Sequence, residues 1–200
     1  MTFTRTAPRF LLLMFVAMTL SACGINNIPT YEEQAKAQWS QVLNQYKRRA
    51  DLIPNLVETV KGFAAQERDV LVGVVEARAK ATQVTLSPDM LTDPAAVEAF
   101  QQAQGQLSSA LSRLLVTVER YPDLKSNQNF LALQNQLEGT ENRISVARRD
   151  YIEAVRVYNT ELKTLPGELW ARFYHTENEP LPTFDIVEAD TATPTVNFDN

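Results

Sequence analysis

The amino-acid sequence predicts an all-α protein, an antiparallel bundle of three long helices followed by a short C-terminal helix. Apolar residues recur at intervals of three, four and seven positions through most of the chain, which is the periodicity of a helix with one buried face. Short polar or proline-containing segments separate three such stretches, and short connections favour antiparallel neighbours packed at shallow angles. No alternating pattern of strand length competes with them.

The first predicted helix covers residues 31 to 83. Thr30 and Glu33 have the spacing of a capping box, in which a hydroxyl and a carboxylate bond to free backbone N–H groups, so the helix is expected to begin immediately after Thr30. Pro54 removes the backbone hydrogen bond to the carbonyl of Ala50, at a cost of about 3 kcal/mol. Burial of each apolar side chain around it contributes roughly 1.5 to 3 kcal/mol. We therefore expect one helix, kinked near Pro54.

The second and third predicted helices have clear ends. Asp93-Pro94 starts the second, because aspartate is a good N-cap and proline is tolerated at the first helical position, and Tyr121-Pro122 ends it. At 1.5 Å per residue it is about 40 Å long, so the first helix, at about 75 Å, is expected to extend beyond it. The third helix starts near Ser126 and stops at Pro166-Gly167. Gln104 and the glutamines around it are expected on a solvated face; the alternative is a hydrogen-bonding surface for a partner protein or a glycan.

The C-terminal part divides into a short helix and a tail. Residues 167 to 174 are expected to form a helix that packs Leu169, Trp170 and Phe173 over one end of the bundle. The bundle is therefore assigned to residues 31–175. Prolines and threonines without periodicity follow, and residues 176–200 are expected to be an extended or disordered tail.

The N-terminal residues have a different composition. Arg5 and Arg9 precede an uncharged, largely apolar run from residue 10 to residue 22, which is the layout of a secretory signal peptide, assigned to residues 1–22. The run is short for a helix that must cross about 30 Å of hydrocarbon, which takes about 20 residues. An uncleaved N-terminal anchor is the alternative to cleavage.

Leu20-Ser21-Ala22-Cys23 resembles the lipobox of bacterial lipoproteins. The resemblance implies that the thiol of Cys23 receives a diacylglycerol and becomes the first residue after cleavage, with residues 23–30 as a lipidated tether. Stable anchoring needs more than one acyl chain, which a lipoprotein cysteine provides. The domain is then expected in the bacterial cell envelope, outside the cytoplasm and on the periplasmic side. Cys23 is the only cysteine, so the fold relies on its core and not on disulfides.

Composition and motifs argue against several function classes. The formal charge of −5, with no long run of lysine or arginine, does not fit nucleic-acid binding. His175 is the only histidine, and no glycine-rich phosphate loop, HExxH or CxxC motif occurs. A di-iron site built on Glu58, Glu138 and Glu141 lacks the histidines that such bundles use. We expect no enzyme activity, no metal and no cofactor.

Two blocks of the sequence resemble the LemA family. The resemblance spans residues 31 to 187 and includes the string DLIPNLV. Its residues are Trp39, 47–64 (KRRADLIPNLVETVKGFA), Glu67, Ala77-Arg78, 147–151 (ARRDY), Val155-Arg156, Tyr158-Asn159-Thr160, Leu165-Pro166, Ala171, Pro182 and Phe184.

The resemblance implies a helical bundle held at the cell envelope, with no substrate and no cofactor. Relatives in magnetosome-forming bacteria are tied to assembling that organelle, which implies a scaffold or adaptor. An alternative implied role is a regulator or adaptor of envelope proteolysis or stress response. The expected partners are the membrane, through the lipid anchor, and an unidentified envelope protein, with the oligomeric state left open. The residues predicted to bind that protein are Arg48, Arg49, Asp51, Asn55, Arg148 and Arg149.

Overall fold

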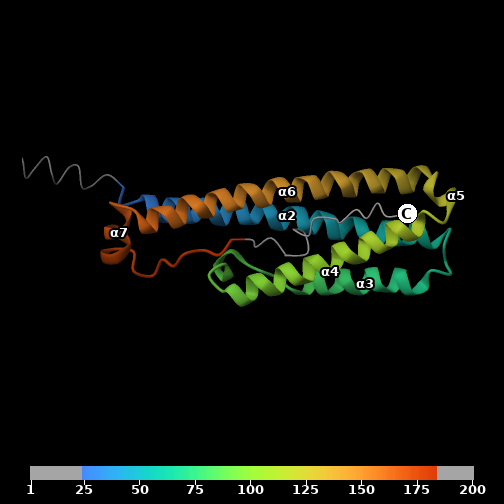
Figure 1. Cartoon of the computed structure of the whole chain (residues 1–200), viewed down its shortest axis with the longest axis horizontal. Helices are drawn as coiled ribbons and strands as arrows, with labels where there is room; N and C mark the ends of the chain where they lie inside the picture. Colours follow the sequence, from blue (N-terminus) through green and yellow to red (C-terminus); the bar gives the residue numbers. More distant parts are fainter. Residues whose placement is uncertain (1–23, 184–200) are drawn as a thin grey trace, which may run out of the picture.

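Two helices of 35 and 36 residues, α2 (Asn27–Lys61) and α6 (Gln128–Lys163), lie side by side and antiparallel along the whole length of the molecule (Figure 1). The computed structural model describes residues 24–183. In that range the elements are helical and no strand occurs, which confirms the all-α class. The remaining elements are α3 (Arg68–Gln83), the 3-10 helix η1 (Pro88–Met90), α4 (Pro94–Val118), α5 (Pro122–Lys125) and α7 (Gly167–Phe173).

Helices α3 and α4 form a hairpin that covers only part of the α2–α6 pair. They pack against the second half of α2 and the first half of α6, so the end of the molecule at α5 has four helices in cross-section (Figure 1). The opposite end, at α7, is built mainly from the first half of α2, the second half of α6 and the short helix itself. Val97 and Phe100 from the start of α4 also contribute to its core. The bundle therefore has more long helices in cross-section at the α5 end than at the α7 end.

The prediction of one helix from residue 31 to residue 83 is wrong. Helix α2 continues through Pro54 and ends at Lys61, and the chain reverses over residues 62–67 before α3 begins. The apolar spacing continues through the reversal, because Val60, Ala64 and Leu71 are all buried in the same core. Sequence periodicity therefore did not reveal the turn. The N-terminal half of α2 does extend beyond the α3–α4 hairpin, as expected, although α2 is shorter than the predicted helix (Figure 1). The kink at Pro54 remains a prediction.

The predicted N-cap of α4 is present, whereas the predicted capping box of α2 is not. At α4 the Asp93 carboxylate accepts hydrogen bonds from the N–H groups of Ala95 and Ala96, as an N-cap should. At α2 the predicted capping box is absent, because the helix begins at Asn27, about one turn earlier. The Thr30 hydroxyl instead donates to the carbonyl oxygen of Asn26, 2.6 Å away.

A polar layer divides the buried interior into two apolar cores. The core at the α7 end includes Trp39 and Tyr151, and the core at the α5 end is built mainly of leucine, valine and alanine. Between them three buried polar side chains, Arg49, Gln104 and Thr140, come from α2, α4 and α6. Gln104 was expected on a solvated face, and its burial corrects that expectation. It follows Phe100 by one helical turn and so lies on the apolar side of α4.

Helix α7 forms where the sequence predicts a short helix, but it packs differently. Trp170 is half-buried against the α7-end core, whereas Leu169 and Phe173 are 48% and 68% exposed and do not cover the bundle end. Gly167 fixes the position of the helix, since a Cβ atom there would lie 2.2 Å from the carbonyl oxygen of Glu161. Only glycine permits so close an approach to α6.

Residues 176–183 return from α7 along α6 without regular secondary structure. The Asn159 side chain exchanges two hydrogen bonds with the backbone of Leu181, of 2.8 and 2.9 Å, and Leu181 is buried in the core at the α7 end. The hydroxyls of Tyr158 and Tyr151 donate to the carbonyl oxygens of Glu179 and Pro182. The packed unit therefore includes residues assigned to the tail by sequence, and the rest of that tail lies outside the described residues.

Within residues 24–183, no helix combines the length and apolar character needed to cross a bilayer. The predicted signal peptide and Cys23 lie outside the described residues.

Candidate functional site

Arg49 is the most buried charged side chain of the predicted partner-binding set. Only 1% of its surface is exposed. One terminal nitrogen donates to Ser108 Oγ at 3.0 Å and to Glu141 Oε1 at 2.9 Å, and the other donates to Gln104 Oε1 at 2.6 Å. The guanidinium carbon lies 5.0 Å from the centre of the Tyr46 ring. In this structure Arg49 is therefore an interior residue, which corrects its expected place on the surface.

The Arg49 cluster links four helices. Arg49 comes from α2, Ser108 and Gln104 from α4, and Glu141 from α6, while the Gln104 side chain also donates to the carbonyl oxygen of Ala81 in α3. A buried charge of this kind requires its partners, because an unpaired one costs several kcal/mol. The cluster therefore fixes the register of the helices where the two cores meet.

The carbonyl freed by Pro54 is also occupied. Arg78 of α3 donates from Nε to the Ala50 oxygen at 2.7 Å. The Ala50 backbone oxygen is therefore not free to bind a partner. At this turn, only exposed side chains could do so. Those are Arg48, Asp51 and Asn55, three of the predicted residues.

A shallow groove runs between α2 and α6 and has a volume of about 370 Å³. The carbonyl oxygen of the Gln45 side chain is buried there and lacks a hydrogen-bond donor. Arg48 lies three residues after Gln45 and seven after Gln41, so it is on the same face of α2. Asn55, seven residues after Arg48, is on that face as well. The groove is lined by Gln38, Gln41, Gln45, Asn142, Arg143, Val146, Ala147 and Asp150.

The two arginines predicted on α6 lie differently. Arg149 is exposed and pairs with Asp150, which lines the groove, at 3.4 Å. Arg148 is half-buried and close to Tyr46. Burial raises the pKa of the Tyr46 phenol, and the charges of Arg148 and Arg49 oppose that shift. The structure therefore does not bring the predicted residues together in the groove. Arg48 lies one helical turn beyond Gln45, Arg149 lies beside Asp150, and Arg49 is buried.

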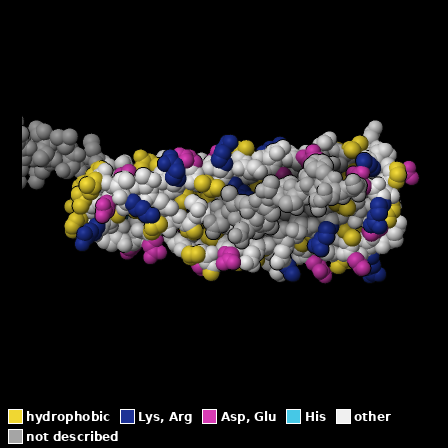
Figure 2. Space-filling view, in the orientation of Figure 1, with side chains coloured by type: hydrophobic (Ala, Val, Ile, Leu, Met, Phe, Trp, Pro, Cys, Tyr) yellow, Lys and Arg dark blue, Asp and Glu magenta, His cyan; other side chains and the backbone are white. Residues whose placement is uncertain are grey.

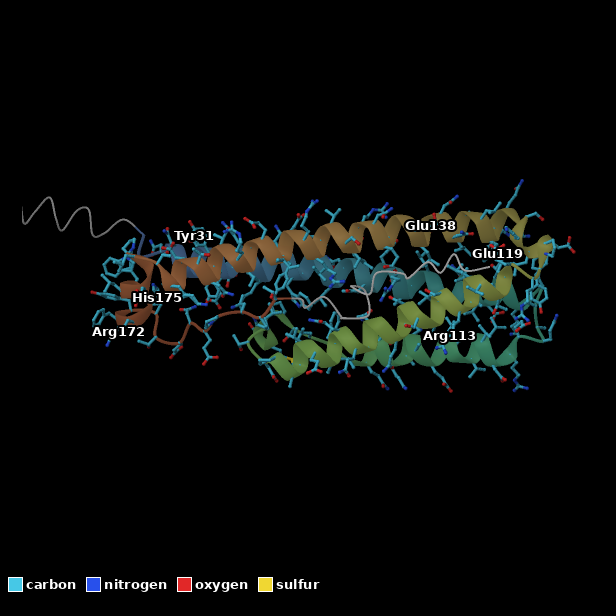
Figure 3. All side chains as sticks on the ribbon, viewed as in Figure 1. Tyr31, Arg113, Glu119, Glu138, Arg172 and His175 are labelled. Carbon is cyan, nitrogen blue, oxygen red and sulfur yellow. The ribbon has the colours of Figure 1, made fainter. Side chains whose placement is uncertain are left out.

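His175, the single histidine, has a structural contact. Its Nε2 atom lies 2.9 Å from the carbonyl oxygen of Ile25, which joins the segment after α7 to the residues before α2. Figure 3 shows His175 and Arg172 at the same end of the molecule as Tyr31, which lies near the start of α2. Across residues 24–183, no group of three or more histidine, cysteine, aspartate or glutamate side chains is arranged to hold a metal ion.

Comparison with known proteins agrees with this architecture. The family model described as LemA family matches residues 38–198, which is most of the chain. The chain belongs to the LemA family.

Three relatives are identical to this LemA-family chain at about a quarter of the aligned positions. Magnetosome protein MamQ 1 and Magnetosome protein MamQ 2 of Paramagnetospirillum magneticum are each 26% identical over 157 residues, 70% of this chain and 58% of the relative. Magnetosome protein MamQ of Magnetospirillum gryphiswaldense is 25% identical over 162 residues, 73% of this chain and 60% of the relative. The chain thus spans about three-fifths of the length of these curated relatives.

Several residues that carry the LemA resemblance have structural roles. Arg49 links the helices, Pro54 and Arg78 meet at the Ala50 carbonyl, and Asn159 holds the segment after α7. Sequence reasoning missed the inward position of Arg49. The signal was present, because Arg49 falls seven residues after Val42 and four before Ile53, both on the buried face of α2.

Proposed function

We propose that this LemA-family chain is a non-enzymatic scaffold or adaptor of the bacterial cell envelope, anchored to the membrane by a lipid on Cys23 with its bundle on the periplasmic side. The observation that carries the proposal is the polar groove between α2 and α6, with a buried, unpaired acceptor on Gln45. The groove is shallow and runs along both helices, whereas small-molecule sites are usually concave clefts that enclose most of the ligand. The groove therefore suits a protein segment better than a small molecule.

The lining of the groove defines the kind of segment that fits. Glutamine and asparagine amides both donate and accept hydrogen bonds, so they suit the alternating N–H and C=O groups of a polypeptide backbone. Arg143 and Asp150 add charges of opposite sign to the lining, Arg149 pairs with Asp150, and Arg48 adds a positive charge one helical turn beyond Gln45. Exposed charges of both signs favour selectivity and correct orientation more than raw affinity. We assign the partner as a protein segment with a mixed-charge flank.

The names of the relatives fit a structural role. Their names describe them as proteins of the magnetosome, which is a cell structure, and specify no reaction. The described helices agree with such a role, since α2 and α6 offer a long rigid face on which a partner can align. A rigid element positions a binding surface more accurately than a loop does.

Site-specific photocrosslinking tests the partner surface. A photoreactive amino acid at Gln41, in the groove, is expected to give a crosslink to one envelope protein in intact cells, and Arg48→Glu in the same chain is expected to reduce that crosslink strongly. The control position is Arg113, which is exposed on α4 (Figure 3). The same adduct at both positions, or an adduct unaffected by Arg48→Glu, would contradict the proposal.

The anchor is tested separately. Mass spectrometry of the mature protein is expected to show Cys23 as the N-terminal residue carrying diacylglycerol, and Cys23→Ser is expected to move the protein out of the membrane fraction. A mature chain that retains residues 1–22 would contradict the lipoprotein part of the proposal and leave the groove experiment unaffected.

A further inference from the structure

Four large apolar side chains are exposed together around helix α7. Leu165, Leu169, Phe173 and Tyr174 are 72%, 48%, 68% and 67% exposed, and they fall within ten consecutive residues. We call these four residues the α7 patch. In Figure 2 yellow apolar side chains gather over the end of the molecule that holds α7. Contiguous exposed apolar surface on a folded domain marks a site of contact with a partner or a membrane.

The α7 patch is held rigidly to the bundle. Gly167 lies directly against the Glu161 carbonyl oxygen. The indole of Trp170 is half-buried in the α7-end core, and its centroid lies 5.6 Å from that of the Tyr174 ring, with the two planes tilted by 59°. The Trp170 indole nitrogen is buried without a hydrogen-bond acceptor. Because α7 is fixed on both α2 and α6, the patch keeps one orientation relative to the long axis of the bundle.

The chain enters the bundle at this same end. An added Cβ atom on Gly24 would lie 3.6 Å from Pro166, at the start of α7, and Ile25 bonds to His175 just after it. The Asn27 side chain donates to Glu161 Oε1 at 3.1 Å. Residue 23 is bonded to Gly24 and is therefore about 3.8 Å from it between Cα atoms. The covalent link to residue 23 therefore starts at the end of the bundle that carries the α7 patch.

We propose that the α7 patch inserts into the interface of a phospholipid bilayer and sets the bundle upright on it. The inference rests on the proposed membrane anchoring at Cys23, which brings the bilayer within about 10 Å of the patch, given the reach of two or three residues. Leucine, phenylalanine, tyrosine and tryptophan are the side chains favoured at the boundary between headgroups and acyl chains. Arg172, exposed on the same helix, is long enough to reach the headgroups.

The position of the α7 patch favours a bilayer over a soluble partner protein as the surface that covers it. A partner protein in solution could approach any exposed face, but a bilayer attached at residue 23 is held against this one by the covalent chain. The long axis of the bundle then points away from the membrane, with α5 and the four-helix end farthest from it (Figure 1). The groove between α2 and α6 faces sideways along that axis.

Depth-dependent fluorescence quenching tests the proposal on the full, anchored protein. Phe173→Trp places an indole in the patch, and Val116→Trp places one at an equally exposed position near the far end of α4, where Val116 is 72% exposed. Both variants retain Trp39 and Trp170, so the background is the same. In vesicles of phosphatidylethanolamine and phosphatidylglycerol with brominated acyl chains, we expect Phe173→Trp emission to be quenched at least about twice as strongly as Val116→Trp emission.

Each other outcome has a defined meaning. Equal quenching of the two variants, in protein that floats with the vesicles, would overturn the bilayer contact and leave the anchor intact. Protein that does not float would overturn the anchor and this inference together. A dimer lost in a Leu169→Ser, Phe173→Ser variant, without selective quenching, would assign the patch to a second copy. Leu169→Trp is a second probe of the patch if circular dichroism shows that Phe173→Trp does not fold.

Discussion

Arg78 donates a hydrogen bond from Nε to the backbone oxygen of Ala50, at 2.7 Å, across the interface between α3 and α2. That oxygen is the acceptor that the residue at position 54 would bond in an uninterrupted helix, and Pro54 has no N–H to offer. A side chain from the next helix therefore replaces the missing backbone donor. The proline that weakens α2 as an isolated helix thus creates a specific attachment point for α3.

Arg78→Met is expected to lower the free energy of unfolding by about 1 to 3 kcal/mol, because it leaves a half-buried carbonyl without its charged donor. Urea denaturation followed by circular dichroism measures the change. The control is Lys80→Met, an exposed position in the same helix, which is expected to stay within about 0.5 kcal/mol of the wild-type value. Equal effects of the two substitutions would contradict the assigned role of Arg78.

A double-mutant cycle tests the link between Arg78 and Pro54. In Pro54→Ala the new backbone N–H can bond to the Ala50 oxygen, so the loss caused by Arg78→Met is expected to shrink by about 1 kcal/mol in that background. The same urea titration gives all four stabilities. Additive effects of the two substitutions would show that Arg78 stabilises the fold independently of Pro54.

Arg49→Lys is expected to destabilise the protein by about 2 kcal/mol. A lysine ammonium cannot present two terminal nitrogens to Ser108, Glu141 and Gln104 at the same time, and buried groups that lose a charged partner are costly. The matched control is Arg48→Lys, one residue earlier and exposed, for which less than about 0.5 kcal/mol is expected. Thermal or urea unfolding measures both, and equal stabilities would contradict the assigned interior role.

Asn159→Ala is expected to release residues 176–183 from α6, because it removes both hydrogen bonds to the backbone of Leu181. Hydrogen exchange at the Leu181 amide should become at least about tenfold faster, which corresponds to about 1.4 kcal/mol of lost protection. Asn142→Ala, on an exposed part of the same helix, provides the control. Unchanged exchange at Leu181 would mean that burial of its side chain alone holds the segment.

Stability is expected to fall above about pH 10. Burial raises the pKa of Tyr46, Tyr151 and Tyr158 above the ordinary tyrosine value of about 10, so above that pH the unfolded chain loses protons that the folded one keeps. Stability from these groups is complete below about pH 10 and declines as pH rises towards the folded pKa. Urea titrations at pH 9 and pH 11 measure the decline.

Tyr151→Phe isolates one contribution to that decline. The substitution removes a buried phenol whose hydroxyl donates a 3.3 Å hydrogen bond to the carbonyl oxygen of Pro182. The loss of stability between pH 9 and pH 11 is therefore expected to become about 1 kcal/mol smaller. An unchanged loss would show that Tyr151 ionises as readily in the folded state as in the unfolded one.

Local chemistry made some elements predictable. The Asp93 cap, the break at Tyr121-Pro122 and the short helix after Pro166 depend on residues close in sequence, and each appears where expected. The reversal at residues 62–67 was missed because its apolar residues keep the helical spacing on both sides of the turn. A contact between distant residues marks that turn instead, since the Tyr121 hydroxyl donates to Glu67 at 2.6 Å.

The sequence by itself determined the helical class, the family and most helix ends, because periodicity and capping act over a few residues. Only the tertiary structure decided which polar residues face inward. Arg48 and Arg49 are adjacent and chemically identical, yet one is exposed and the other is buried. The physical reason is that a buried guanidinium is tolerated only with acceptors around it, and those of Arg49 come from positions 55 to 92 residues away in the chain.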